Sequence, residues 1–214
     1  IMTAFLSLDK VTKRFKNDLV FEDVCLTAEP GQIVGLVGHN GCGKTVLFKC
    51  IVGLQKIQSG QIQIANQVIG RDVEIAQNVG ILLEKPGFIP YLSGQANLEQ
   101  LAAIRRTIDR AQVEAVLQSV GLYQARHKKV STYSLGMRQR LGIAQAIMEA
   151  PDLVILDEPF NGLDKEGLQQ IYQVVEDLAA RGITILMASH YQADIQRLCQ
   201  KVYQFENHHL YQQS

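Results

Sequence analysis

The most constraining feature of this chain is a short apolar run that leads directly into a glycine-rich segment ending in Lys-Thr. Residues 33–37 read Ile-Val-Gly-Leu-Val, which predicts a buried strand, and residues 44–52 predict a helix that Gly53 closes. Between them, residues 38–45 match the pattern G-x-x-x-x-G-K-[ST] in full. A strand, a glycine loop and a helix in this order predict backbone N–H groups that hold a polyphosphate, assisted by the helix dipole.

The positions of this loop have expected roles in binding a polyphosphate. Lys44 is expected to reach the β- and γ-phosphates, and the hydroxyl of Thr45 to ligate Mg²⁺. The alternative is a glycine turn that ends in Lys-Thr by coincidence, which the flanking strand and helix disfavour. The predicted binding set is Gly38, His39, Asn40, Gly41, Cys42, Gly43, Lys44, Thr45 and Val46.

A second apolar strand ends in two carboxylates. Residues 153–156 are Leu-Val-Ile-Leu, and Asp157 and Glu158 follow at once. Ligands bind at the carboxyl ends of parallel strands, so Asp157 is predicted to hold Mg²⁺ directly or through water. Glu158 points elsewhere and is predicted to orient and deprotonate an attacking water. A capped strand end followed by a solvated acid is the alternative, which loses weight beside a phosphate loop.

The rest of the pattern predicts one α/β core with two additions. Alternation at residues 5–8 and 19–26 predicts an antiparallel opening sheet, which residues 61–65 rejoin. Helical spacing covers residues 96–121 and 134–150. Further strands are expected at 79–83, 153–156 and 183–188, a helix on residues 168–179, and a β-like tail at 201–211.

Composition narrows the classes of function. The 21 Lys and Arg residues balance 21 Asp and Glu residues, which argues against a nucleic-acid-coating or polybasic membrane-binding protein. The four cysteines show no C-x-x-C spacing and are expected to be reduced thiols of a cytosolic protein. The first residues do not follow a signal-peptide pattern, and no apolar run approaches the roughly 18–20 residues of a membrane helix. Work at a membrane is therefore expected to need a partner.

A third motif opens the second helical stretch. Residues 133–140 read Tyr-Ser-Leu-Gly-Met-Arg-Gln-Arg, with Ser134 as the expected N-cap, which alone is usually only a helix start. Five motifs follow one another along the chain: the phosphate loop, the two carboxylates, this run, Asn-Gly-Leu-Asp at 161–164, and Ser189-His190. Their order and spacing are those of the ABC-transporter ATPase, which the chain resembles over nearly its whole length. Ser-Leu-Gly-Met and residues 80–87 resemble most the bacitracin-resistance and lantibiotic-immunity type.

The resemblance implies a fold. It is a P-loop NTPase (RecA-like) α/β core with a parallel sheet, an N-terminal antiparallel β subdomain and an inserted α-helical subdomain. The expected boundaries are about 3–30 and 60–75 for the β subdomain, 31–59, 76–84 and 151–214 for the core, and 85–150 for the helical subdomain.

The resemblance also implies a head-to-tail dimer of two copies, with ATP and Mg²⁺ bound between them. The signature residues Ser134, Leu135, Gly136 and Met137 of one copy then face the γ-phosphate of ATP in the other. Asp164 couples the two sites, His190 contacts the γ-phosphate and helps to position water, and Phe15 stacks on adenine. A half-buried strand residue is the alternative for Phe15, and an ordinary strand-end histidine is the alternative for His190.

Four positions depart from the family pattern. Glu84 stands where most members have Gln; it can still ligate Mg²⁺, but its charge would make the site depend more on the metal. Val46 replaces a hydroxyl that often touches the α-phosphate, and Met137 removes a polar group from the signature. Lys165 replaces a common Pro, with no consequence that the sequence reveals.

These observations predict an ATP-hydrolysing motor subunit of an ABC exporter for antimicrobial-peptide resistance or immunity. We expect transmembrane permease subunits to dock near Glu84–Leu92, an apolar loop that alternatively packs onto the helical lobe. The expected location is cytoplasmic, peripheral on the inner face of the plasma membrane. The alternatives are a soluble ABC ATPase with a nucleic-acid or ribosomal partner, a non-hydrolytic scaffold and a small-molecule kinase; charge balance speaks against a nucleic-acid partner.

Overall fold

A six-stranded sheet forms the centre of the molecule in the computed structural model, which describes residues 4–83 and 86–213. The strand order is β10-β9-β3-β8-β7-β6, and all neighbouring pairs are parallel except β9 with β10. The loops that follow β3, β7 and β8 therefore meet at one edge of the sheet. The strands are β3 Ile33–Val37, β6 Val79–Leu82, β7 Leu153–Asp157, β8 Thr184–Ala188, β9 Lys201–Glu206 and β10 His209–Gln212.

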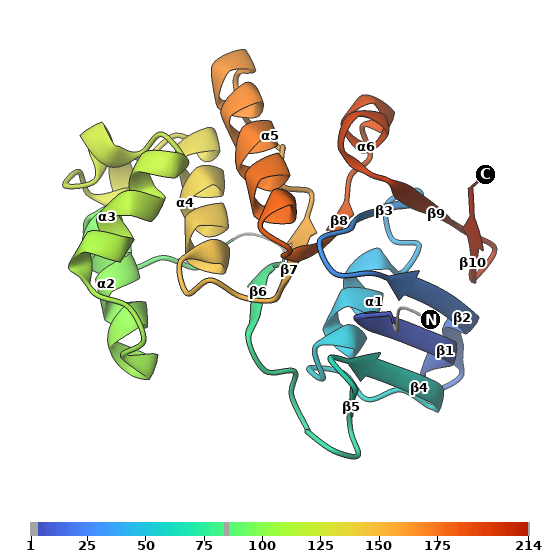
Figure 1. The fold of residues 1–214 in the computed structure, drawn as a ribbon. Helices are drawn as coiled ribbons and strands as arrows, with labels where there is room; N and C mark the ends of the chain where they lie inside the picture. Colours follow the sequence, from blue (N-terminus) through green and yellow to red (C-terminus); the bar gives the residue numbers. More distant parts are fainter. Residues whose placement is uncertain (1–3, 84–85, 214) are drawn as a thin grey trace.

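A smaller antiparallel sheet, in the order β2-β1-β4-β5, lies beside this core (Figure 1). Its strands alternate between apolar and polar residues, and the apolar faces of β1 and β2 pair in register, with Leu6 opposite Ala28 and Leu8 opposite Leu26. The helix α1 (Lys44–Ile51) packs between the two sheets through Leu47 and Phe48. The strands are β1 Leu6–Phe15, β2 Asp18–Ala28, β4 Ser59–Ile64 and β5 Gln67–Val68.

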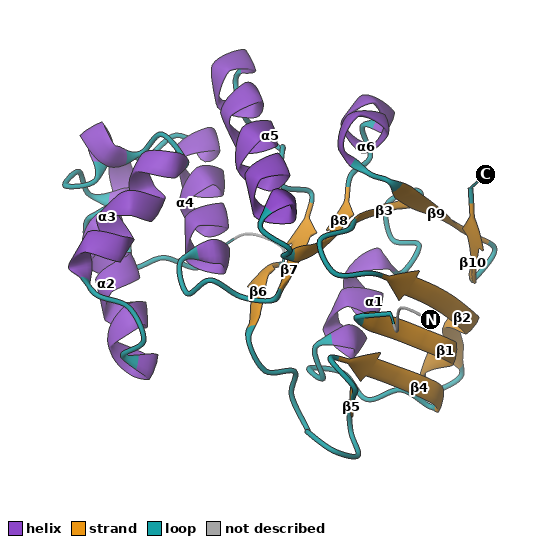
Figure 2. Cartoon of the chain, in the orientation of Figure 1, coloured by secondary structure: helices purple, strands orange, loops and turns teal. Residues whose placement is uncertain are grey.

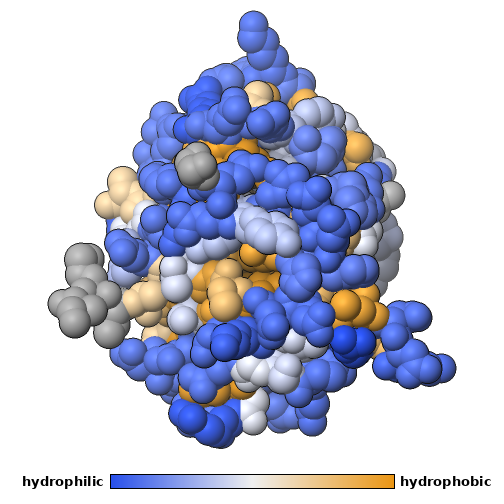
Figure 3. Space-filling view, turned by 90° about the vertical axis from the view of Figure 1, so that its right-hand side faces the viewer, coloured by the Kyte–Doolittle hydropathy of each residue, from blue (hydrophilic) through white to orange (hydrophobic). Residues whose placement is uncertain are grey.

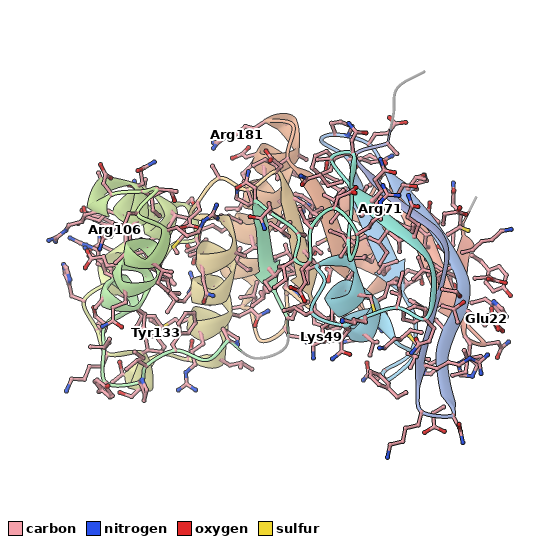
Figure 4. All side chains as sticks on the ribbon, turned by 90° about the horizontal axis from the view of Figure 1, so that it is seen from below. Glu22, Lys49, Arg71, Arg106, Tyr133 and Arg181 are labelled. Carbon is pink, nitrogen blue, oxygen red and sulfur yellow. The ribbon has the colours of Figure 1, made fainter. Side chains whose placement is uncertain are left out.

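Three helices form a lobe at the other end of the molecule (Figure 2). Figure 4 shows that Arg106 and Tyr133 lie on this lobe, while Glu22 of β2 lies at the far end of the molecule and Arg71 lies in the turn that follows β5. Side chains at the N-caps fix where the helices begin, because each accepts a hydrogen bond from the first turn. The helices are α2 Gly94–Arg105, α3 Arg110–Ser119 and α4 Leu135–Ile147.

Two more helices, α5 (Lys165–Ala180) and α6 (Gln192–Leu198), contact the central sheet and each other. Buried residues of α5 and α6 pack in the same hydrophobic core as buried residues of the three lobe helices. In the part of the chain that the structure describes, no helix combines the length and the apolar character that crossing a membrane requires. On the face shown in Figure 3, hydrophilic residues predominate and apolar residues come to the surface in patches between them.

The predicted fold class is confirmed, and most predicted elements agree with the structure to within a few residues. The predicted helical stretch 96–121 is divided into α2 and α3, because Arg106 adopts a left-handed conformation at φ 57° and Asp109 caps a new helix. The prediction missed α6, and it did not place the tail β9 in the parallel sheet. The subdomain boundaries stay predictions.

Candidate functional site

The phosphate loop connects β3 to α1 at the edge of the sheet, as the sequence predicts. Gly43 and Gly41 adopt φ values of 114° and 80°, which favour glycine over other residues. A Cβ on Gly38 would lie 2.7 Å from the sulfur of Cys42 and 2.9 Å from the Cβ of Phe205. Glycine is therefore required for different reasons at these positions, namely backbone conformation at two of them and close packing at the third.

Lys44 reaches back across this loop. Its side chain is buried, and Nζ donates to the carbonyl oxygens of Gly38 at 2.7 Å and His39 at 3.1 Å. A buried ammonium needs such partners, since an unpaired charge in the interior is costly. The positive charge thus lies at the centre of the loop, where an anionic ligand would sit.

Thr45 and Asp157 face each other across the edge of the sheet. The hydroxyl of Thr45, in the first turn of α1, donates to a carboxylate oxygen of Asp157, the last residue of β7. The two side chains supply hard oxygen donors, which suit Mg²⁺; this ion keeps several waters and takes few protein ligands. Among the described residues no group of three or more His, Cys, Asp or Glu is placed to hold a metal ion.

Glu158 and His190 form a second pair at the same edge. Oε2 of Glu158 lies 2.7 Å from Nδ1 of His190 and accepts a longer contact, 3.3 Å, from the backbone N–H of His190. The backbone of Glu158 has a φ of 51°, a strained conformation for a residue with a Cβ. Its carbonyl accepts from the side chain of Gln139 at 3.0 Å, and its N–H donates to Ala188. This backbone conformation directs the carboxylate toward the end of β8.

Lys44, Thr45, Asp157 and Glu158 border a cavity of about 1060 Å³, whereas His190 is not part of its lining. Phe15 lies at its rim, 44% exposed, beside Val20 of β2. The site residues of the sequence analysis that line it are Phe15, Asn40, Gly41, Gly43, Lys44, Thr45, Val46, Leu135, Asp157 and Glu158. Four further residues line it: Gln139, Asn161 and Gly162, which belong to the sequence motifs but were given no role in the site, and Val20, which the sequence analysis did not single out.

The remaining loop positions lie away from this cavity. Gly38 and His39 line a neighbouring cavity of about 490 Å³ together with Ser189 and His190, and Asn40 lines both. Cys42 is half-buried within the loop, with its sulfur 3.8 Å from Nζ of Lys44. Two cavities therefore border the loop.

The signature segment begins α4, as predicted. Ser134 is exposed at the N-cap, and its hydroxyl accepts from the N–H of Met137 at 3.2 Å. Leu135 is exposed, whereas Gly136 is buried so close to Gly162 that an added Cβ would lie 2.6 Å from its carbonyl oxygen. Met137 packs against the hydrophobic core. Ser134 and Leu135 are thus the signature residues that the fold presents to solvent.

Asp164 caps α5: its Oδ1 accepts from the N–H of Gly167 at 2.8 Å. This cap is enough to favour Asp at the position, and a role between two subunits stays a prediction. Lys165 is exposed in the first turn.

The predicted docking loop is described only in part, because Glu84 and Lys85 lie outside the described residues. Phe88 packs against the core of the helical lobe, as the alternative interpretation expects. Asn97 of α2 holds the backbone N–H and carbonyl of Ile89. Tyr91 is 70% exposed. The loop is therefore anchored on the lobe and presents one large aromatic side chain to solvent.

Comparison with known proteins places this site in a family. Residues 21–161 match the ABC transporter family. The chain is similar to the uncharacterised ABC transporter ATP-binding protein YdbJ of Bacillus subtilis, with 41% identity over 92% of the chain and 65% of YdbJ. It is also similar to the bacitracin transport ATP-binding protein BcrA of Enterococcus faecalis, with 36% identity over 98% of the chain and 69% of BcrA. The chain thus spans about two thirds of the length of these relatives.

A solved structure of the ATP-binding subunit of an ABC transporter superposes with a TM-score of 0.87 at 26% identity, covering 99% of this chain and 90% of the other. The structural match thus covers nearly the whole chain, and the family match covers residues 21–161 within it. The chain belongs to the ABC transporter family and is an ATP-binding domain of it.

Proposed function

We propose that this chain hydrolyses Mg·ATP as the motor subunit of a transporter that exports antimicrobial peptides. The observation that carries the proposal is the convergence at one sheet edge of a buried ammonium, a hydroxyl–carboxylate pair and a glutamate–histidine pair. Phosphoryl transfer needs mainly positioning and neutralisation of charge, and these groups supply both.

The reaction follows from the roles of these side chains. Lys44 neutralises the β- and γ-phosphates, and the first turn of α1 directs backbone N–H groups toward them. Thr45 and Asp157 would hold Mg²⁺, which supplies charge neutralisation on the phosphate oxygens when bound. An ionised Glu158 can only accept hydrogen bonds, so Nδ1 of His190 donates to its Oε2. The other carboxylate oxygen, Oε1, is then available to take the proton of an attacking water.

We propose further that two copies bind ATP head to tail. The large cavity beside the phosphate loop and the exposed Ser134 and Leu135 at the start of α4 support this arrangement, in which each copy completes the site of the other. Such an interface is isologous and has two-fold symmetry. Asp164 lies one residue before α5 and would meet the partner at the same interface.

The cargo class is proposed from the relatives. BcrA is named for bacitracin transport, and LnrL of Bacillus subtilis, 29% identical, for linearmycin resistance. We therefore propose an antimicrobial peptide or related compound as cargo, and permease subunits that dock near the loop 86–92 on the inner face of the plasma membrane. Neither the balanced charge nor the relatives favour a nucleic-acid partner.

The test is steady-state release of inorganic phosphate by the purified chain. We expect turnover that EDTA abolishes, and a loss of about 10²- to 10⁴-fold in Glu158→Gln, because a positioned general base contributes this much. Glu206→Gln, on the exposed end of β9, is the matched control and should turn over like wild type. Equal rates in wild type and Glu158→Gln would refute the assigned role.

A further inference from the structure

A buried polar cluster lies directly behind the Glu158–His190 pair. Its centre is Asp194 of α6, whose side chain is only 5% exposed. One carboxylate oxygen accepts from the hydroxyl of Tyr172 in α5, and the other accepts from the hydroxyl of Ser189 at 3.2 Å. The oxygen of Ser189 in turn accepts from the backbone N–H of Tyr191 at 3.1 Å. Three elements, α5, α6 and the loop after β8, are thus joined through one carboxylate.

A buried carboxylate is kept only where its hydrogen bonds are fixed, since leaving it unpaired is costly. Burial, followed by the hydrogen bond to Asp194, raises the pKa of Tyr172 to about 12, so its hydroxyl remains a donor at neutral pH. The guanidinium of Arg197 lies 4.3 Å from the centre of the Tyr172 ring and covers it. These contacts therefore fix the side chains of Asp194 and Tyr172 in one arrangement.

This cluster contacts the segments that carry both Glu158 and His190, although the two residues follow different strands. On one side, the ring of Tyr172 packs edge-on against Phe160, two residues after Glu158, with ring centres 5.1 Å apart. On the other side, Ser189 and Tyr191 flank His190, and the rings of His190 and Tyr191 lie 3.9 Å apart. The cluster thus holds the backbone on either side of a histidine whose own side chain is partly exposed.

We propose that Asp194 is a positioning residue for ATP hydrolysis: through Ser189 it fixes the loop 189–191 so that His190 meets the carboxylate of Glu158. The inference rests on the proposed function, because it assigns Asp194 a part in the same reaction. Asp194 does not line the cavity, and its carboxylate accepts hydrogen bonds from Tyr172 and Ser189. Its effect passes through the orientation of His190, and a displacement of about 1 Å at a reacting group can cost about 100-fold in rate.

The test compares steady-state kinetics of Asp194→Asn, Ser189→Ala and Tyr172→Phe with those of Tyr203→Phe. Tyr203 is a matched control because it is also buried and its hydroxyl accepts a hydrogen bond, from Thr27, on the far side of the sheet. We expect each of the three variants to lower kcat by about tenfold, with KM for ATP changed less than twofold, because the phosphate loop is untouched. Tyr203→Phe should keep the wild-type kcat.

A double-mutant cycle separates positioning from a general loss of packing. If Asp194 acts through His190, Asp194→Asn should cause no further loss of kcat in a His190→Ala background. A full tenfold loss in that background, or an equal loss in Tyr203→Phe, would overturn the inference. Should Asp194→Asn fail to fold, Ser189→Ala keeps the charge and decides the question in the same cycle. A wild-type chain without phosphate release would refute the proposed function instead.

Discussion

Lys44→Met removes the ammonium at the centre of the phosphate loop while keeping an unbranched apolar stem of similar length. In the structure Nζ makes two hydrogen bonds to loop carbonyls, at 2.7 and 3.1 Å. With ATP bound, the same charge would contact the phosphates. A charge-assisted hydrogen bond contributes about 1.5–3 kcal/mol, so the loss of one weakens ATP binding by about 10- to 160-fold.

The assay is thermal unfolding with and without ATP. At an ATP concentration of about 100 times the wild-type Kd, binding stabilises the folded chain by about 2.7 kcal/mol. For a chain of this length about 1 kcal/mol raises Tm by about 2–4 °C, so the wild-type shift is about 5–11 °C. A variant that binds about 100-fold more weakly gains only about 0.4 kcal/mol, or about 1–2 °C.

The ATP-dependent shift, and not the Tm of the free chain, is the quantity to compare. Lys128→Met, in an exposed position of the helical lobe, is the control and should keep the full shift. If Lys44→Met also kept the full shift, Lys44 would not contact the phosphates, and the reasoning from the buried ammonium would be refuted.

Three further predictions follow from packing and burial. Gly80→Ala places a Cβ 1.8 Å from the carbonyl oxygen of Ala146, so the free energy of unfolding measured in urea should fall by about 3 kcal/mol. Gly87→Ala is the control and should change it little, because the added Cβ meets nothing within 4 Å. Burial raises the pKa of Cys50 to about 11 and that of Cys199 to about 12, so at pH 8 a thiol reagent should label these two only after unfolding. Both thiols titrate near 9.0 when unfolded, so their contribution to the free energy of unfolding should be constant below that pH and should fall above it, where the unfolded chain binds fewer protons. A free energy of unfolding that did not fall between pH 9 and 11 would contradict the burial argument.

The local part of the site follows from the sequence because its motifs are contiguous. The run from residue 33 to residue 52 contains the strand, the glycine loop and the helix. Gly43 is fixed by the pattern and has a positive φ, whereas Gly41 has a positive φ at a position that the pattern leaves variable. The position of Asp157 is predictable for the same reason, because the residue that ends a buried strand of a parallel sheet lies at the edge where ligands bind.

The parts that the sequence left open depend on contacts between distant segments. Gln139 reaches the carbonyl of Glu158 only because α4 packs beside the loop after β7. The helix α6 has seven residues and only three of them are buried, which gives too little periodicity to distinguish it from a loop. The left-handed backbone conformation of Glu158 could not be predicted, because the position is not a glycine.

The cluster around Asp194 also depends on contacts between distant segments. Tyr172, Ser189 and Asp194 come from three separate elements, and no spacing in the sequence brings them together. Once α5 and α6 pack against the sheet and each other, their hydrogen bonds are fixed. Sequence patterns therefore identified the residues expected to contact ATP, and the structure was needed to find those that we propose to hold Glu158 and His190 in place.

The most direct test of the account is the oligomeric state of Glu158→Gln with Mg·ATP, measured by size-exclusion chromatography with light scattering. The variant lacks the proposed general base but keeps the phosphate loop, so it should bind ATP without turning it over. The account predicts twice the chain mass with Mg·ATP and the single-chain mass with ADP. A single-chain mass in both conditions, with ATP shown to be bound, would contradict the proposal that ATP lies between two copies.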